Sequence, residues 1–241
     1  MGLAQAGQRQ KKGLGNTGSG LLKLRLGCAK FERGIKVEKK KSDGQHAISV
    51  RKVAQANFPS RHGTFKIVAF VSNDGKEHVA LVKDGAREKP PLVRLHSECL
   101  TGDALGSKRC DCGRQLQSAL GMIAKNGSGA LLYLSQEGRG IGLANKIRAY
   151  ALQDKGRDTV QANIELGFGA DERDFAFAAC MLRRLGFEKI RLITNNPQKV
   201  RALEENGIEV VQRVAHKAFR TRENAKYLRT KKEKMGHLLD V

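Results

Sequence analysis

The sequence predicts an α/β fold, with a layered mixed sheet, flanking helices and an antiparallel hairpin near the N-terminal end of the folded part. Two observations lead to this prediction. Short apolar runs typical of buried strands alternate with segments of helical periodicity over most of the chain. Before them, two strand-like segments over 64–72 and 78–83 flank Asn73-Asp74-Gly75, a sequence typical of a hairpin turn.

The remaining elements follow in order. Pro90-Pro91 precedes a short strand over 92–96, which leads into a cysteine-rich segment. Glycines mark the ends of several predicted helices, as at Asn126-Gly127. The polar, basic residues 215–241 are expected to form a loop and a short helix. Between these segments the sequence predicts helices over 115–125, 143–155, 175–185 and 198–206, and strands over 130–134, 190–194 and 208–214.

The chain has 241 residues and a formal net charge of +21. Eleven of its 45 Lys and Arg residues lie in residues 1–49, and the remaining excess is spread over the body. We therefore divide the chain into a basic, disordered extension over 1–48 and a folded domain over 49–241. Such charge attracts polyanions of any kind, including nucleic acid, phosphorylated metabolites and anionic membrane surfaces. The extension is a candidate for non-specific polyanion contact.

Cellular location is predicted from what the sequence lacks. It has no run of eighteen apolar residues and no apolar N-terminal stretch before a small-residue cleavage site. Five cysteines in 241 residues do not make a disulfide scaffold. We therefore expect a cytoplasmic protein with no membrane partner.

Three of the five cysteines lie within SECLTGDALGSKRCDCG, at Cys99, Cys110 and Cys112. A Cys110–Cys112 disulfide would close a strained small ring, and a bridge from Cys99 to either would leave an odd thiol. Thiolates at this spacing suit Zn²⁺, and three ligands without an obvious fourth are typical of a catalytic site open to water. His96 is the nearby candidate for a fourth ligand, and free buried cysteines remain the alternative. Cys28 and Cys180 have no such neighbours, so we interpret Cys28 as an incidental thiol of the extension and Cys180 as a thiol in the core face of a helix.

The glycine-rich stretch QEGRGIG over 136–142 follows one predicted strand and precedes a helix. Its spacing matches neither the dinucleotide-binding fingerprint nor a P-loop. Glu137 can accept hydrogen bonds from a guanine edge, and Arg139 can bind a phosphate as a bidentate fork. A tight structural turn explains the glycines equally well.

Two further stretches carry polar groups at element ends. Thr194 and Lys199 lie in TNNPQK after a predicted strand, where α/β sheets place ligands, although an ordinary helix cap also explains the motif. The cluster DERD over 171–174 opens a predicted helix. Acids in a first turn usually complement the helix dipole, which is the plain alternative to a catalytic role.

Taken together, in this order and spacing, these stretches resemble GTP cyclohydrolase II, the zinc enzyme that commits GTP to riboflavin synthesis. The resemblance runs from about residue 50 to residue 239, and the basic extension has no counterpart in it. Each motif is weak alone, but the composite is specific. The matching stretches are RLHSECLTGDALGSKRCDCGRQL, QEGRGIGLANKIRAYALQDKG, DTVQANIELGFGADERDF, TNNPQK and YLRTKKEKMGHLL.

The resemblance implies one Zn²⁺ per chain on Cys99, Cys110 and Cys112. It also implies a proton acceptor at Asp171 and a nucleophile at Arg173. The nucleophile role is chemically awkward because a guanidinium stays protonated, so an electrostatic role for Arg173 remains open. The active-site tyrosine associated with ring opening falls on Tyr150.

The implied GTP-contacting residues come from five separate parts of the chain. One departure from the family pattern is Ser135, where family members often carry Arg, so affinity for the phosphates is open to question. The contacts fall on Arg94, Leu95, His96, Ser97, Glu98, Gln115, Glu137, Gly138, Arg139, Thr159, Thr194 and Lys199.

The reaction that the resemblance implies is hydrolysis of GTP at the imidazole ring of guanine, with release of formate and pyrophosphate. The implied product is 2,5-diamino-6-ribosylamino-4(3H)-pyrimidinone 5′-phosphate. We expect Mg²⁺ on the triphosphate and a homodimer. The alternatives are a diverged homologue that yields a formamidopyrimidine, and a basic zinc protein that binds nucleic acid.

Overall fold

The computed structural model describes residues 48–86 and 89–239. The predicted extension therefore falls outside the described residues except for Ile48, and so does Cys28. No helix in the described part of the chain is long and apolar enough to cross a bilayer.

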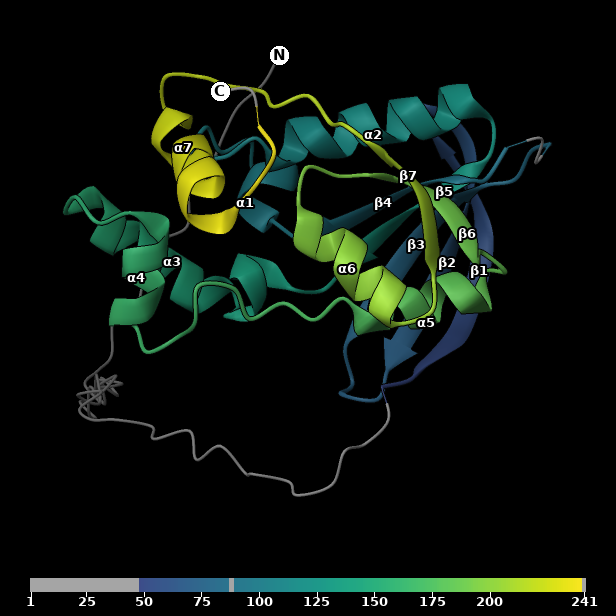
Figure 1. Ribbon diagram of the computed structural model, residues 1–241, viewed down its shortest axis with the longest axis horizontal. Helices are drawn as coiled ribbons and strands as arrows, with labels where there is room; N and C mark the ends of the chain where they lie inside the picture. The colour runs from purple at the N-terminus through teal and green to yellow at the C-terminus, as the bar shows by residue number, and fades with distance from the viewer. Residues whose placement is uncertain (1–47, 87–88, 240–241) are drawn as a thin grey trace, which may run out of the picture. The chain divides into compact units, whose positions relative to one another are not determined.

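Seven strands form one mixed sheet in the order β1-β2-β3-β5-β4-β6-β7 (Figure 1). The first half, up to β5, is antiparallel, whereas β5, β4, β6 and β7 run parallel to one another. The predicted mixed sheet with an N-terminal antiparallel hairpin is confirmed. The strands are β1 Val50–Ser60, β2 Gly63–Ser72, β3 Glu77–Lys83, β4 Leu92–Ser97, β5 Gly129–Leu134, β6 Lys189–Ile193 and β7 Glu209–Val214.

The hairpin between β2 and β3 turns where the sequence predicts it. Gly75 has a φ of +81°, a conformation that glycine adopts without steric penalty. Its N–H donates to the Ser72 carbonyl at 2.9 Å. β1 pairs with β2 at the outer edge of the sheet and was not predicted, because its side chains are almost all exposed and give no apolar alternation.

Helices cover both faces of the sheet (Figure 1). On one face, Val93 and Leu95 of β4 join a core with α5 and α6. On the other face, Leu92 and Leu131 pack against α2. Successive side chains of β4 therefore point to opposite faces of the sheet, and Arg94 and His96 lie on the face covered by α2. The three helices are α2 Cys112–Asn126, α5 Ala176–Arg184 and α6 Pro197–Glu205.

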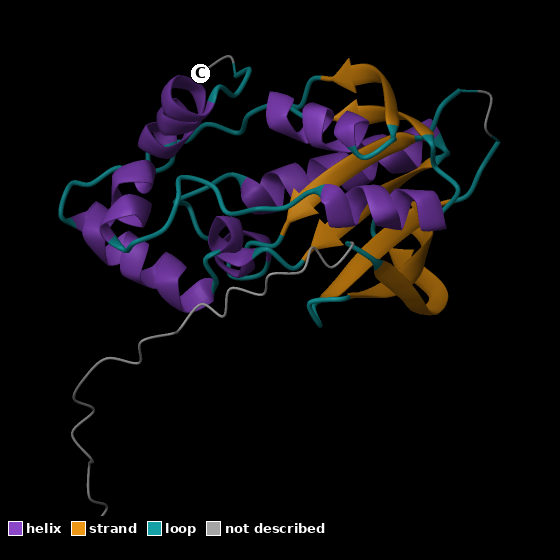
Figure 2. Cartoon of the chain, turned by 60° about the horizontal axis from the view of Figure 1, so that its bottom comes forward, coloured by secondary structure: helices purple, strands orange, loops and turns teal. Residues whose placement is uncertain are grey.

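A second group of helices lies beyond the carboxyl ends of the parallel strands (Figure 2). There α3 contacts α4, and α4 contacts α7. An Asp158–Gln161 capping box begins α4, which was not predicted, and α7 is the short C-terminal helix that was. The elements are α1 Leu100–Asp103, the 3₁₀ turn η1 Glu137–Gly140, α3 Leu143–Asp154, α4 Thr159–Glu165 and α7 Ala225–Met235.

The DERD cluster is not the first turn of a helix. Residues 171–174 form an irregular segment, and α5 begins two residues later, at Ala176. Asp174 accepts a hydrogen bond from the Ala176 N–H at 2.8 Å and is the member of the cluster that bonds the start of α5. Dipole complementation therefore does not account for Asp171 and Arg173.

Candidate active site

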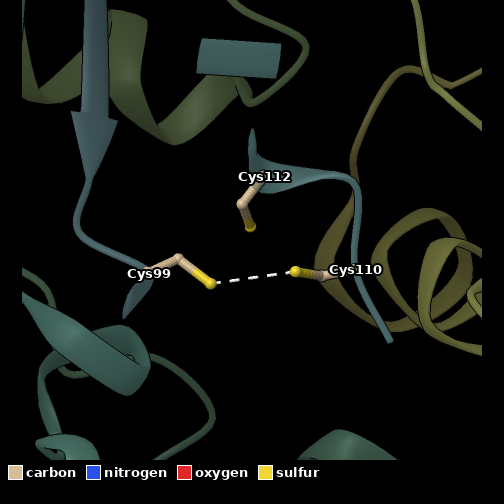
Figure 3. Close-up of side chains that lie close together, drawn as sticks. All are labelled: Cys99, Cys110 and Cys112. Carbon is tan, nitrogen blue, oxygen red and sulfur yellow. Dashed lines mark hydrogen bonds between the residues drawn. The ribbon is translucent and has the colours of Figure 1, made fainter. Parts of the chain in front are cut away.

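The three predicted metal ligands meet just beyond the carboxyl end of β4 (Figure 3). Cys99 precedes α1, Cys110 lies in the loop after it, and Cys112 is the first residue of α2. The Sγ atoms lie within 4.8 Å of one another, and those of Cys99 and Cys110 are 3.7 Å apart. Two thiolates on a tetrahedral zinc, with Zn–S bonds of about 2.3 Å, lie about 3.8 Å apart. The separation in this chain fits that geometry.

The backbone beneath the cluster is shaped for three sulfurs. A Cβ on Gly102 would lie 2.7 Å from the Cys110 Sγ and 3.1 Å from the Cys99 Sγ. A Cβ on Gly113 would lie 2.2 Å from the Gly102 carbonyl oxygen. Two facing glycines therefore let α1 and α2 approach closely enough for the thiols to converge.

The charge environment also suits a cation. Hydrogen bonds from Cys110 and Cys112, with the nearby Lys146 ammonium, hold the pKa of the Cys99 thiol well below its usual value. Thiolate is the form that binds metal. Hydrogen bonds with Cys110 and Cys99, together with burial, raise the pKa of Cys112 instead, as expected where three thiols crowd together without a cation.

His96 is not part of the thiol cluster. Its Nε2 lies 2.9 Å from the Asp103 carboxylate, and its ring stacks on Tyr133 with centroids 5.5 Å apart. The same carboxylate oxygen accepts from the Tyr133 hydroxyl at 2.9 Å and from the Cys99 N–H at 3.0 Å. His96 therefore helps to hold the loop that carries Cys99. Cys180 lies apart on α5, half-buried beside Arg183.

The thiol cluster lies in the wall of a cleft of about 1190 Å³, including space open to solvent. The cleft brings together most of the predicted site residues: Arg94, His96, Ser97, Glu98, Cys99, Cys110, Cys112, Gln115, Glu137, Gly138, Arg139, Tyr150, Thr159, Arg173, Thr194 and Lys199.

Two predicted residues do not line the cleft. The Leu95 side chain is fully buried in the core on the other face, and only its carbonyl reaches the site, where it accepts from Lys199 Nζ at 2.7 Å. Asp171 lies behind Arg173 and accepts from its Nε at 2.7 Å. Burial alone would raise the pKa of Asp171, but the Arg173 guanidinium outweighs it and lowers that pKa.

Arg94 and Gln115 form one wall. The Arg94 guanidinium donates to Gln115 Oε1 at 2.7 Å and to the Ile193 carbonyl at 3.1 Å, whereas its Nε has no partner in the described structure. Burial lowers the Arg94 pKa to about 10, so the group stays charged at neutral pH. A cation is thus held rigidly across the carboxyl ends of β4 and β6.

The glycine-rich turn η1 places Arg139, whose backbone is strained, in the wall of the same cleft. Arg139 has φ 63° and ψ 35°, a left-handed conformation that is unfavourable for a residue with a Cβ. Both of its terminal guanidinium nitrogens are buried without a hydrogen-bond partner in the described structure. A strained backbone and two unpaired donors indicate a site prepared for an anion.

Glu137 is already bonded to protein. Its Oε1 accepts from Lys146 Nζ and from the Gly138 N–H, both at 2.8 Å, and its Oε2 accepts from the Leu100 N–H at 2.7 Å. Three of the carboxylate's acceptor positions are thus taken. Glu137 joins the glycine-rich turn to the cysteine loop as well as lining the cleft.

The part of the cleft at Lys199 and Arg173 is strongly cationic. Lys199 is buried, and burial together with the charges of Arg94 and Arg173 lowers its pKa well below the usual value. Its ammonium and the Arg173 guanidinium each lie 5.2 Å from the centre of the Phe175 ring. Like charges packed this tightly are unfavourable until an anion binds among them.

Tyr150 lies on α3 beside the thiols. Its hydroxyl is 3.2 Å from Thr101 Oγ1, which in turn is 3.7 Å from the Cys99 Sγ. The Arg109 guanidinium covers its ring at 4.9 Å. The tyrosine hydroxyl therefore lies in the immediate surroundings of the metal-binding group.

Several residues that line the cleft were not singled out from the sequence. α7 supplies Tyr227 and Lys231, and His237 follows it; the tail YLRTKKEKMGHLL was recognised as a motif but gave no residue assignments. Lys231 lies 3.6 Å from Asp111 and 4.4 Å from the centre of the Tyr227 ring. Lys146 was hidden in the helix after the glycine-rich turn. Its apolar neighbours at helical spacing were the only feature of the sequence that could have indicated its burial.

Ser135 does not line the cleft. Its hydroxyl donates to Glu98 at 3.2 Å, and its N–H donates to His78 Nδ1 at 3.1 Å. The Ser135 side chain therefore offers no direct contact to a ligand in the cleft.

Comparison with known proteins agrees with this geometry. Residues 51–215 match the family model described as GTP cyclohydrolase II. The chain belongs to the GTP cyclohydrolase II family. It is 56% identical over 194 residues to the GTP cyclohydrolase-2 of Proteus mirabilis (strain HI4320), covering 80% of this chain and 98% of that protein.

The chain is also similar to other known proteins. The chain is 55% identical to the GTP cyclohydrolase-2 of Haemophilus influenzae (strain PittGG) over 79% of its length and 89% of the relative. The riboflavin biosynthesis protein VVA0006 of Vibrio vulnificus (strain YJ016) is 56% identical, and the match spans 53% of it. Among solved structures, a two-domain 3,4-dihydroxy-2-butanone 4-phosphate synthase from A. baumannii matches at 22% identity and a TM-score of 0.40, covering 71% of this chain and 41% of that one.

The match to the GTP cyclohydrolase II model ends before α7. The cleft residues Tyr227, Lys231 and His237 therefore lie outside the part of the chain that defines the family match. Every predicted site residue lies inside it.

Proposed function

We propose that this chain opens the guanine imidazole ring of GTP by hydrolysis, releasing formate and pyrophosphate as the first step of riboflavin biosynthesis. The product is 2,5-diamino-6-ribosylamino-4(3H)-pyrimidinone 5′-phosphate. One observation carries the proposal, namely that a three-thiol cluster and a group of buried cations line the same cleft. The first suits a hydrolytic metal, and the second suits a triphosphate.

Cys99, Cys110 and Cys112 would hold one Zn²⁺. When bound, zinc lowers the pKa of a water ligand and so supplies hydroxide near neutral pH. The chain's own contribution is to fix three thiolates above Gly102 and to leave the side toward the cleft free of a fourth protein ligand. His96 is occupied by Asp103, which supports the open position.

The purine would lie between β4 and the glycine-rich turn. Arg94, Gln115 and the segment through Ser97 and Glu98 form one side, and the turn over 137–139 forms the other. Leu95 takes part through its carbonyl, which positions Lys199. Thr159 at the start of α4 and Thr194 after β6 also line the cleft, where the buried Thr194 hydroxyl accepts from the Asn196 N–H at 3.0 Å.

The triphosphate would occupy the cationic end. Arg139 presents two unpaired nitrogens, and Lys199 supplies a buried amine that a bound anion would stabilise in its charged form. Arg173 is held in orientation by Asp171, so we assign it stabilisation of charge on the phosphoryl group as the pyrophosphate leaves. Asp171 holds Arg173 and is the nearest base to it, so the covalent role implied by the family remains compatible with this arrangement.

Mg²⁺ would enter with the triphosphate. Among the described residues, the three cysteines are the one group of three or more potential metal ligands. This described part of the chain therefore offers no carboxylate cage for a second ion. Mg²⁺ commonly binds through substrate phosphates.

Tyr150 would move a proton during ring opening. Burial raises the pKa of its hydroxyl above the usual value, so the group is protonated and can donate. Thr101 and Arg109 hold the ring beside the thiols.

We assign this activity to residues 49–241 and propose that the extension over 1–48 is dispensable for turnover, and we propose a homodimer. Ile147 on α3 and Ile164 on α4 are 49% and 61% exposed and are available for a subunit contact. Sedimentation of the full-length chain and turnover by a 49–241 fragment test these two points.

The test of the function is incubation of the zinc-loaded protein with GTP and Mg²⁺ while formate, pyrophosphate and the pyrimidine are followed separately. We expect all three in equal amounts. Pyrophosphate without formate would refute the full ring-opening reaction, and the nucleotide formed with it, a formamidopyrimidine or GMP, would distinguish a formamidopyrimidine-forming homologue from simple hydrolysis of the anhydride. No reaction with GTP would refute the proposal. Cys112→Ser should abolish zinc binding, whereas Cys180→Ala should retain it.

A further inference from the structure

We propose that Lys146 is a positioning residue that ties the metal-binding loop to the substrate-binding turn. Its meaning for catalysis rests on the proposed function, but its contacts do not. The Lys146 ammonium donates to the Cys99 Sγ at 3.1 Å and to Glu137 Oε1 at 2.8 Å. One charge thus bonds a metal ligand and a residue of the glycine-rich turn.

The ion pair between Lys146 and Glu137 is buried, and a second hydrogen bond lies beside it. The side chains of Lys146 and Glu137 are each 10% exposed, so water screens their pairing poorly. A second hydrogen bond, from the Leu100 N–H to Glu137 Oε2 at 2.7 Å, joins the same two segments. The cysteine loop and the turn are therefore bonded at two neighbouring points, one through the thiol and one through the backbone.

The surrounding backbone is adapted to this lysine. A Cβ on Gly138, which has a φ of +63°, would lie 3.1 Å from the Lys146 Cβ. Tyr150 lies one turn along α3, on the same face, and the Lys146 ammonium is 5.8 Å from the centre of its ring. The first turns of α3 thus present an ammonium and a phenol side by side to the thiols.

Lys146 also changes the net charge around the metal site. Three thiolates around a divalent cation carry a net charge of −1, and the cleft must also accept a polyanion. An ammonium bonded both to one thiolate and to the Glu137 carboxylate offsets part of the negative charge of this group where the purine would approach. Partners bonded to metal ligands commonly account for 10–100-fold in metal affinity or activity.

The experiment compares Lys146→Met with Arg148→Met. Arg148 is exposed on the same helix and bonds only its neighbour Asn145 in the described structure, so it controls for the loss of a positive charge from α3. Zinc affinity is measured on the full chain by competition with a chromophoric chelator, without GTP. The Co²⁺-loaded protein is compared by its thiolate-to-cobalt charge-transfer band.

We expect Lys146→Met to weaken zinc binding about 10- to 100-fold and to shift the cobalt band, and Arg148→Met to do neither. Lys146→Arg, which keeps the charge, should recover most of the affinity. At saturating zinc, Lys146→Met should also raise the Kd for a non-hydrolysable GTP analogue, because Glu137 loses its anchor.

Unchanged zinc affinity and an unchanged cobalt band in Lys146→Met would overturn the proposal. Circular dichroism establishes that the variant is folded, and Lys146→Gln, of similar length, replaces it if it is not. Loss of zinc affinity in a chain that does not hydrolyse GTP would refute the proposed function and leave this inference standing.

Discussion

Gly102→Ala is the most direct test of the metal site. The added Cβ would lie 2.7 Å from the Cys110 Sγ and 3.1 Å from both the Cys99 Sγ and the Cys112 Cβ. Ordinary contacts of a Cβ are 3.4–4 Å, so at least one sulfur has to shift by about 0.7 Å. A metal site tolerates changes of only about 0.2 Å in its ligand distances.

We therefore expect Gly102→Ala to lose zinc affinity by at least 100-fold, as one thiolate is pushed out of reach. Overpacking should also lower the free energy of unfolding of the metal-free protein by about 1–3 kcal/mol. The first quantity is measured by chelator competition and the second by urea denaturation in the presence of a reductant and a chelator.

Gly121→Ala is the matched control. Gly121 lies on α2, the helix that begins at Cys112, and a Cβ there would meet only the His62 ring at 3.7 Å. We expect unchanged zinc affinity and a small gain in stability, up to about 1 kcal/mol, from the better helix former. Equal zinc affinity in Gly102→Ala and Gly121→Ala would refute the argument that Gly102 shapes the thiol cluster.

Three further predictions follow from the cleft. Arg139→Gly should raise the free energy of unfolding by about 1 kcal/mol relative to Arg139→Ala, because glycine adopts φ 63° without strain, while both variants weaken binding of a GTP analogue in calorimetry. Lys231→Met should raise the KM for GTP about tenfold with a smaller change in kcat. Lys232→Met, at an exposed position of the same helix, should change neither constant. Equal values of KM and kcat in the two variants would exclude a role of Lys231 in substrate binding. Burial and the nearby Arg94 lower the pKa of His216 to about 3 from an ordinary 6.5, so the unfolded chain binds the extra proton between these values and stability falls as the pH drops below 6.5. From pH 7 to pH 5 this loss is about 2 kcal/mol, and denaturation of His216→Gln should show a correspondingly shallower pH dependence.

Most of the sheet and its helices could be predicted because apolar runs and glycine stops mark them. The outer strand β1 could not, because an edge strand with exposed side chains has no apolar alternation to detect. Helix α4 was not predicted, although the sequence of the Asp158–Gln161 capping box is typical of a helix start. Local pattern thus found most of the elements that bury apolar side chains and missed an exposed edge strand and a short helix.

The candidate site divides in a similar way. Cys99, Cys110 and Cys112 could be grouped from their spacing, and the structure confirms that they meet. The roles of Lys146 and Lys231 could not be read from the sequence, because a lysine on a helix usually lies in solvent. Their proximity to the thiols depends on how α3 and α7 pack beyond the sheet.

The pairing of β4 with β5 sets the spacing between the two halves of the site. His96 lies opposite Tyr133 and Ser97 opposite Leu134, and the Glu98 N–H still donates to the Leu134 carbonyl at 2.8 Å after the strands end. One inserted residue in either strand would slide one loop past the other by about 3.3 Å and turn its side chains to the opposite face. During evolution, insertions and deletions should therefore accumulate in connections such as 84–91 and be selected against in these two short strands. The distance between the metal-binding loop and the substrate-binding loop should then stay constant among descendants of this chain.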